Sequence, residues 1–253
     1  MRLEALIFDV DGTLANTEKD GHLKAFNMAF EQMGLDWYWS NKMYHHLLTV
    51  TGGKERIKFY LESYNKDFYH DNLDSLINQI HKQKTANYVE LIGQGLVPLR
   101  VGVKRLIDEA LSKGIRLAIA TTTTPANVDA LINSTLGNEY MANFEFIGAG
   151  DMVAKKKPAA DIYTYVLEKM DLEPCQTLAI EDSLNGLLSA SSAGIESVMT
   201  VNEYTNDHNL DGALVVLDHL GDKDNKFSLI SGDITNKTLV DVDYLRELHA
   251  KNC

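Results

Sequence analysis

A short apolar run near the start of the chain leads two carboxylates into a turn, and this feature constrains the chain most. Residues 6–8 and Val10 are apolar and predict a short buried strand, which Gly12 lets the chain leave without a side-chain penalty. Asp9 and Asp11 lie two residues apart at its end, so both would face one side. One carboxylate could then attack an electrophile while the other handles protons or helps to seat a metal ion. An ordinary Asp-Gly turn after a strand is the plainer alternative.

The composition favours a cytoplasmic protein with one large core. At 253 residues and 45% hydrophobic content, the chain can bury one substantial core and leave material for a smaller domain. The net charge of −12 argues against nucleic acid, which needs a basic surface, and no apolar run reaches membrane-spanning length. Cys175 and Cys253 have no spacing typical of a zinc site, and the N-terminus shows no export pattern. We therefore expect a cytoplasmic protein with no nucleic-acid or membrane partner.

The order of the remaining patterns predicts a core that is split by an insert. After the first strand, about 80 residues carry no convincing strand, and alternating strand and helix patterns follow. Strands separated by helices predict an α/β, doubly wound parallel sheet, in which sites lie beyond the carboxyl ends of the strands. In the insert, Leu73, Ile77 and Ile80 recur at helical spacing and favour a packed helix. Residues 93–98 are glycine-rich and end in proline, which is typical of a return linker that could act as a hinge.

The elements after the linker are predicted from helix signals and apolar runs. An amphipathic pattern predicts a helix over residues 103–114, and Pro125 and Pro158 suit the first turns of two further helices, the second running to about Met170. The predicted strands cover residues 115–120, 144–147, 178–180, 196–201 and 213–217. About the last 30 residues show no clear pattern of either kind.

Polar or charged residues follow apolar runs at three later points, as they do at the first aspartate pair. In chain order these are Thr121 with Thr122, Lys157 before Pro158, and the acidic pair Glu181 and Asp182. Hydroxyl and amide donors, a cation and metal-binding carboxylates are the groups that a dianionic phosphate needs. The pattern resembles the four motifs of the haloacid dehalogenase-like hydrolase superfamily, which implies a Rossmann-like core with an inserted helical cap domain. The resulting division is a discontinuous core of residues 1–16 and 94–253 and a cap of residues 17–93.

The resemblance implies a nucleophile and a metal site. Asp9 would form an aspartyl-phosphate, while Asp11 would protonate the leaving oxygen and then activate the hydrolytic water. Mg²⁺ would be held by the side chains of Asp9 and Asp182 and by the main-chain carbonyl of Asp11. Glu181 would assist directly or orient a water molecule.

The resemblance also implies how the phosphoryl group is held. The Thr121 side chain and the Thr122 amide would bind its oxygens, and Lys157 would neutralise both the nucleophile and the phosphoryl group. Each residue has a plainer interpretation. Residues 155–157 are all lysines, and such a run is usually a solvated face, while the threonines before Pro125 could simply cap a helix.

Substrate choice is expected to lie in the cap, where Thr51 is followed by two glycines and two basic residues. Gly52 and Gly53 would expose amides near a helix start, and Lys54 and Arg56 add positive charge, a combination suited to a second phosphate. A helix start with a solvent-exposed basic turn is the alternative.

This segment, together with His22 upstream and Arg100 after the linker, is similar to the CbbY-like phosphatases, a group associated with sugar bisphosphates such as xylulose 1,5-bisphosphate. The resemblance implies a Mg²⁺-dependent phosphatase whose partner is a small phosphorylated sugar and in which His22 binds a substrate hydroxyl or organises the hinge. We expect a monomer or a weak homo-oligomer.

Two other functions are weighed against the phosphatase. A β-phosphoglucomutase shares the cap type and the carboxylates, but such mutases usually place a lysine where this chain has Thr124. A non-catalytic sugar-phosphate-binding protein would be expected to lose a catalytic position, and none is lost. We rank the mutase second and the non-catalytic binder third.

Overall fold

One mixed sheet forms the centre of the protein in the computed structural model, which describes residues 2–233 and 237–252. The strands are arranged β3-β2-β1-β4-β5-β6-β7, and only the pairing of β7 with β6 is antiparallel. On the central strand, Phe8 lies opposite Ile119 of β2 and Ile180 of β4, so the three strands end at the same level. The strands are β1 (Ala5–Phe8), β2 (Arg116–Ala120), β3 (Phe144–Gly148), β4 (Thr177–Glu181), β5 (Glu196–Thr200), β6 (Val215–Leu217) and β7 (Leu229–Gly232).

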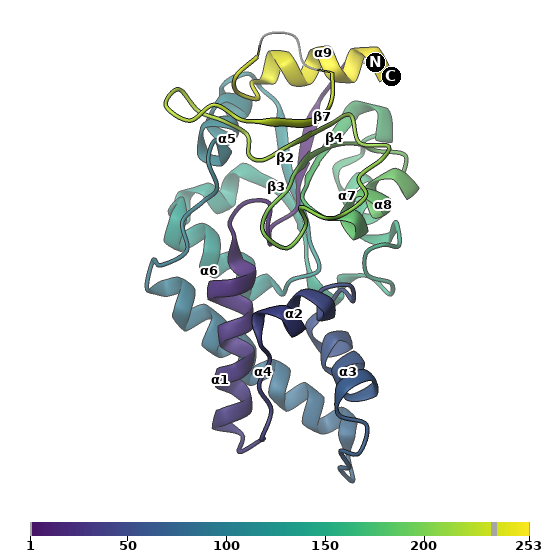
Figure 1. Ribbon diagram of the computed structural model, residues 1–253. Coiled ribbons are helices and arrows are strands. Elements are labelled where there is room, and N and C mark those ends of the chain that lie inside the picture. The colour runs from purple at the N-terminus through teal and green to yellow at the C-terminus, as the bar shows by residue number, and fades with distance from the viewer. Residues whose placement is uncertain (1, 234–236, 253) are drawn as a thin grey trace.

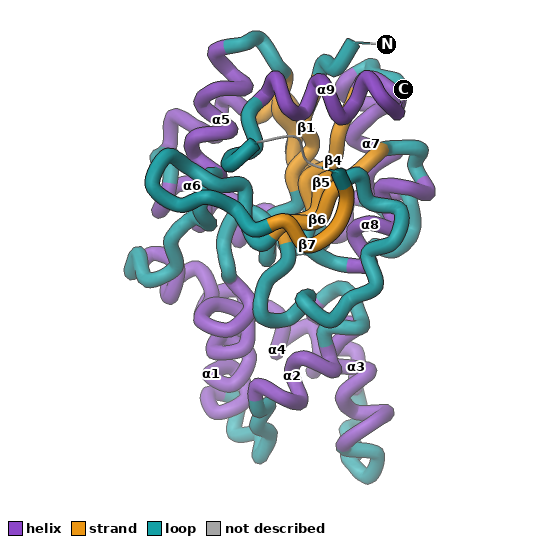
Figure 2. Tube along the Cα trace, turned by 45° about the horizontal axis from the view of Figure 1, so that its top comes forward, coloured by secondary structure: helices purple, strands orange, loops and turns teal. Residues whose placement is uncertain are grey.

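Helices cover both faces of this sheet, as Figure 2 shows. Successive side chains of a strand point to opposite faces, so Phe8 packs in the cluster that includes Leu106 and Leu131, whereas Ile7 packs with Tyr163 and Ala190. The first cluster is supplied by α5 (Val103–Ser112), α6 (Pro125–Thr135) and α9 (Val242–Asn252), and the second by α7 (Asp161–Met170) and α8 (Leu184–Ser192). The fold is therefore the doubly wound α/β architecture that the sequence predicts.

Four further helices form a separate group below the sheet in Figure 1. They are α1 (Lys24–Gln32), α2 (Asn41–Leu47), α3 (Gly53–Tyr64) and α4 (Leu73–Gly93), and we call residues 17–93 the cap. The cap has its own aromatic core, in which the rings of Phe26 and Trp39 lie 4.5 Å apart. Its two connections to the rest of the chain run next to each other, because Ala15 pairs with Leu99 in an antiparallel bridge. The cap therefore leaves and rejoins the rest of the chain at one place.

The structure corrects the expected elements in two places. α7 begins at Asp161 rather than in a first turn at Pro158, because residues 158–160 form turns before the helix. The C-terminal region contains β7 and α9, which were not predicted; Val242, Leu245 and Leu248 recur at helical spacing in α9 and are buried. None of the helices in the described part of the chain is long and apolar enough to cross a membrane.

Candidate active site

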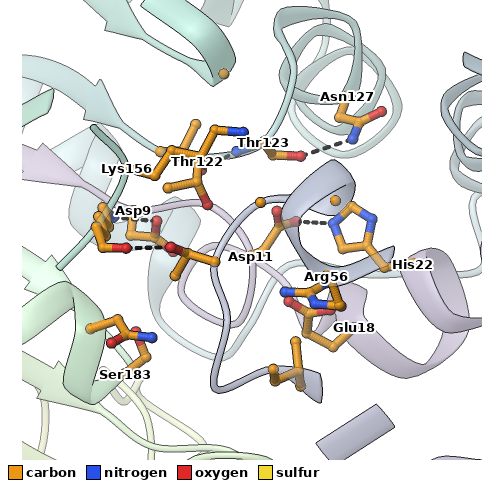
Figure 3. Close-up of a pocket in the computed structure, with 18 of the residues that line it drawn as sticks. Asp9, Asp11, Glu18, His22, Arg56, Thr122, Thr123, Asn127, Lys156 and Ser183 are labelled. Carbon is orange, nitrogen blue, oxygen red and sulfur yellow. Dashed lines mark hydrogen bonds and ion pairs between the residues drawn. The ribbon is translucent and has the colours of Figure 1, made fainter. Parts of the chain in front are cut away.

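The ends of the three central strands bring the predicted motif residues to one cavity. Asp9 follows β1, Thr121 follows β2 and Asp182 follows β4, and all three side chains line the cavity. Its volume is about 550 Å³, within the range of sites for small ligands. Cap and core both contribute to its walls, as Figure 3 shows for Asp9 and Arg56.

A buried lysine joins the first and fourth motifs. Nζ of Lys157 lies 2.7 Å from Oδ1 of Asp9 and 2.5 Å from Oε1 of Glu181, and the hydroxyl of Tyr163 donates to the same Glu181 oxygen over 2.7 Å. Burial, together with the nearby carboxylates Glu181 and Asp182, raises the pKa of Asp9 well above its usual value although Lys157 opposes the shift. Burial disfavours a charged Lys157, but the two carboxylates that it contacts raise its pKa above the usual value. A positive charge is thus held next to Asp9.

Three buried carboxylates offer a site for a hard cation. One ligand oxygen from each of Asp9, Glu181 and Asp182 lies within 4.8 Å of the others. Burial and the neighbouring Glu181 raise the pKa of Asp182 to about 8, although the Arg100 charge and the hydrogen bond from Asn202 oppose the shift. Carboxylate oxygens are the donors that Mg²⁺ prefers, so the donor set fits this ion. Among these donors, Glu181 already accepts hydrogen bonds from Lys157 and Tyr163. This favours a role for Glu181 in orienting a ligand of the ion and not in direct coordination.

The second aspartate of the first motif is bound to the start of the cap. Oδ1 of Asp11 accepts hydrogen bonds from Thr17 over 2.6 Å and from Nε2 of His22 over 2.8 Å (Figure 3). The other ring nitrogen of His22 lies 2.6 Å from Nζ of the buried Lys84, and the ring stacks on Tyr88. Burial alone would raise the pKa of Asp11, but His22 and Thr17 hold it below the usual value. Asp11 is therefore ionised in this arrangement.

The threonine run forms the cavity wall between β2 and α6. Thr121 is buried, its amide donates to the carbonyl of Gly148 over 2.9 Å, and its hydroxyl accepts from the amide of Thr123 over 3.3 Å. Thr122 also lines the cavity. Thr124 caps α6 by accepting from the amide of Asn127, so the capping interpretation holds for this residue alone.

The cap contributes a cationic wall to the same cavity. Gly52 precedes α3 with φ of +92°, Gly53 begins the helix, and both line the cavity, where amides of a first helical turn lack intrahelical acceptors. Arg56 is buried; its Nη1 donates to the Tyr44 hydroxyl over 3.0 Å, and that hydroxyl donates to Glu18 over 2.5 Å. Its Nε atom has no hydrogen-bond partner within residues 2–233 and 237–252. Arg56 lines the cavity, and a guanidinium in a cavity wall suits an anionic ligand.

Two residues expected to bind substrate lie outside the cavity lining. Nζ of Lys54 is instead 2.8 Å from Asp151 of the core, so its charge is paired across the gap between cap and core. The Arg100 guanidinium is directed away from the cavity into the core, where it donates to main-chain carbonyls. Its acceptors are the carbonyl oxygens of Gly12, Thr200, Val201 and Asp218. The expectation that Arg100 contacts substrate is therefore corrected, because its donors are engaged within the protein.

Several lining residues were not expected from the sequence. His81 and Lys84 lie four and seven residues after Ile77, on the same face of α4. Helical spacing was therefore the signal that could have found them. Burial, with the nearby Lys84, Lys54 and Lys156, lowers the pKa of His81 to about 3, so the ring is neutral. Glu18 and Lys156 are further lining residues, and no local pattern distinguishes them from surface charges.

Comparison with known proteins places the chain in a family. Residues 6–200 match the haloacid dehalogenase-like hydrolase family. The CbbY protein of Cupriavidus necator is 48% identical over 221 residues, which are 87% of each chain. The crystal structure of CbbY from Rhodobacter sphaeroides in complex with phosphate has a TM-score of 0.80 at 45% identity and covers 86% of this chain and 94% of that one.

A mutant of the same Rhodobacter sphaeroides protein, crystallised with xylulose-(1,5)bisphosphate, also has a TM-score of 0.80, at 44% identity and with the same coverage of 86% and 94%. The likeness thus extends through cap and core, beyond the short motifs. The chain belongs to the haloacid dehalogenase-like hydrolase family and, within it, to the CbbY-like group.

Proposed function

We propose that this protein is a Mg²⁺-dependent phosphatase that hydrolyses a sugar bisphosphate, with a pentulose bisphosphate such as xylulose 1,5-bisphosphate as the expected substrate. The observation that carries the proposal is a single cavity with Asp9 and Lys157 in its core wall and Gly52, Gly53 and Arg56 in its cap wall. Such a cavity offers separate positions for a reacting phosphate and a second anion. The relative that binds xylulose-(1,5)bisphosphate supports the same substrate class.

In the first step, a carboxylate oxygen of Asp9 would bond to phosphorus while the ester P–O bond breaks, and Asp11 would give a proton to the departing sugar oxygen. Asp11 would first have to take up that proton, because it is ionised when Thr17 and His22 bind it as they do here. In the second, Asp11 would take a proton from a water molecule whose oxygen attacks phosphorus, so that the Asp9–phosphorus bond breaks and phosphate is released. Lys157 contacts Asp9 at 2.7 Å and would stabilise the negative charge of the transferring group. The Thr121 hydroxyl and the Thr122 amide would bind the phosphoryl oxygens.

The carboxylates of Asp9 and Asp182, with the main-chain carbonyl of Asp11, would hold Mg²⁺, and Glu181 would orient a ligand of the ion. When bound, Mg²⁺ supplies positive charge that offsets the repulsion between the acidic cluster and an anionic substrate. The closeness of the three buried carboxylates supports this assignment.

The second phosphate of the substrate would lie against the start of α3. Amides of the first turn and the guanidinium of Arg56 supply donors there, while the neutral His81 ring adds a hydrogen-bonding group without a charge. Glu18 orients Tyr44 and thereby Arg56, and its carboxylate offers an acceptor for sugar hydroxyls.

The direct test is phosphate release in the presence of Mg²⁺ from xylulose 1,5-bisphosphate, ribulose 1,5-bisphosphate, β-glucose 1-phosphate and a generic aryl phosphate. Preference for a pentulose bisphosphate over the monophosphates is the expected result. Equal turnover of all four would contradict the second-phosphate site. Glucose 6-phosphate formed from β-glucose 1-phosphate with a bisphosphate primer, without phosphate release, would show a mutase instead.

A further inference from the structure

Arg100 lies where the cap rejoins the core and connects separate loops of the core. Its amide donates to the carbonyl of Leu14 over 2.8 Å, next to the Ala15–Leu99 bridge. Its Nη1 donates to the carbonyls of Gly12 and Thr200, the latter over 2.8 Å. Its Nη2 donates to the carbonyls of Val201 and Asp218 over 2.5 and 2.6 Å. One side chain thus fixes the turn after Asp11 and the loop after β5.

The loop after β5 carries a side chain that holds Asp182. Nδ2 of Asn202 lies 2.7 Å from Oδ2 of Asp182 and 3.3 Å from the carbonyl oxygen of Gly12. Gly12 itself is packed against the same carboxylate, since a Cβ placed there would lie 2.2 Å from Oδ2 of Asp182. The Gly12 carbonyl is therefore shared by Arg100 and Asn202, and the two residues before Asn202 are acceptors of Arg100.

We propose that Arg100 is a positioning residue that acts through Gly12 and Asn202 to hold the Asp182 carboxylate where it can bind the metal ion. The proposal rests on the proposed function in requiring a cation at the carboxylate cluster. A guanidinium presents donors in a rigid plane and reaches four carbonyls from separate loops, whereas a lysine ammonium is a point donor on a flexible stem. Loss of the planar group frees Gly12 and the loop of Asn202 to separate, and Asp182 loses a fixed orientation.

The chain contains a matched control in Arg105, which lies five positions further along. Arg105 also donates to main-chain carbonyls, those of Gly221, Leu220 and Val240, and burial lowers the pKa of both guanidinium groups. Its carbonyl acceptors belong to the C-terminal part of the core and not to the loops of Gly12 or Asn202, and its Nη1 also donates to Glu109 of the same helix over 3.2 Å. R100K and R105K therefore make the same chemical change in a similar setting.

The experiment is calorimetric titration of the metal-free full-length protein with MgCl₂, with unfolding by urea measured on the same samples. We expect R100K to bind Mg²⁺ about 10-fold more weakly than wild type, as for other residues that orient metal ligands, and R105K to bind it as wild type does. N202A, which leaves the acceptors of Arg100 in place, is expected to weaken binding by a similar factor. In the N202A background, R100K should then have little further effect, because both act on Asp182 by one route.

Equal Mg²⁺ affinity in R100K and wild type, equal losses in R100K and R105K, or additive effects of R100K and N202A would each overturn the proposal. If R100K does not fold, N202A alone decides, and unchanged affinity in N202A overturns it. A wild-type protein that binds no Mg²⁺ would overturn the metal assignment of the proposed function, and this proposal with it. The first three results would leave that assignment intact.

Discussion

Nζ of Lys157 lies 2.7 Å from Oδ1 of Asp9, and both side chains are buried although the residues are 148 positions apart in the chain. Asp9 follows the central strand and lines the cavity, and the contact adds a cation beside its carboxylate. Because asparagine has nearly the same shape as aspartate, Asp9→Asn removes the carboxylate without creating a void.

We expect Asp9→Asn to lower kcat by about 10³-fold or more, because an amide cannot form the acyl-phosphate bond. Far-ultraviolet circular dichroism and urea unfolding should show a folded protein, and Asp129→Asn, on an exposed carboxylate of α6, serves as the control with normal turnover. Substantial residual turnover in Asp9→Asn would remove this residue from the nucleophile role.

Arg56→Ala is expected to reduce kcat/KM for a bisphosphate by roughly 10- to 150-fold, the equivalent of one charged hydrogen bond of about 1.5–3 kcal/mol. Turnover of a small aryl phosphate should change far less, since such a substrate does not reach α3. Lys58→Ala, on the same helix but with a side chain that is 52% exposed, should change neither. Equal losses on both substrates would show that Arg56 supports the cap and does not bind a second phosphate.

The raised pKa of Asp182, about 8 against an ordinary value of 3.8, predicts how stability depends on pH. A group that holds its proton more tightly when folded stabilises the fold at low pH, and this contribution is lost as pH rises from about 4 to about 8. In EDTA, the free energy of unfolding should therefore fall between pH 5 and pH 8, and less steeply in Asp182→Asn. Saturating Mg²⁺ should offset the fall in wild type because the ion replaces the proton. The same slope in both proteins would contradict the raised pKa.

Cap closure should depend on a set of four alternating charges at the junction of cap and core. Lys54 and Glu55 of the cap pair with Asp151 and Lys156 of the core at 2.8 and 3.0 Å, and Lys156 also lies 3.0 Å from Asp151. Because most of these groups are partly exposed, we expect Lys54→Asp to lower kcat/KM by no more than about fivefold, and to a similar extent for mono- and bisphosphates. The combined exchange Lys54→Asp with Asp151→Lys should recover activity. Stopped-flow turnover at low and high KCl would measure the loss in the single variant and the recovery in the double variant. A loss confined to bisphosphates would return Lys54 to the substrate site.

Local sequence patterns were sufficient for the core of the fold and for the central site residues. The apolar runs before Asp9, Thr121 and Asp182 identify strands, and parallel strands that alternate with helices end at one edge of a sheet. These residues could therefore be placed in one site before any contact was known. The same reasoning failed for Pro158, where a typical helix signal precedes α7 by three residues, and for α9, whose apolar residues lie in a strongly polar segment.

The partners of the buried charged side chains Lys84 and Arg100 were decided by tertiary structure alone. Lys84 has the spacing of a helix residue like any other, yet it is buried against His22, which comes from a segment 62 positions earlier. Arg100 was expected at the substrate, but the folded core places four carbonyl acceptors around it. Periodicity along the chain determines which face of an element is buried, because that depends only on neighbouring residues. Which partner a buried charge meets depends on loops that are distant in the chain, and those loops come together only when the sheet and the cap have packed.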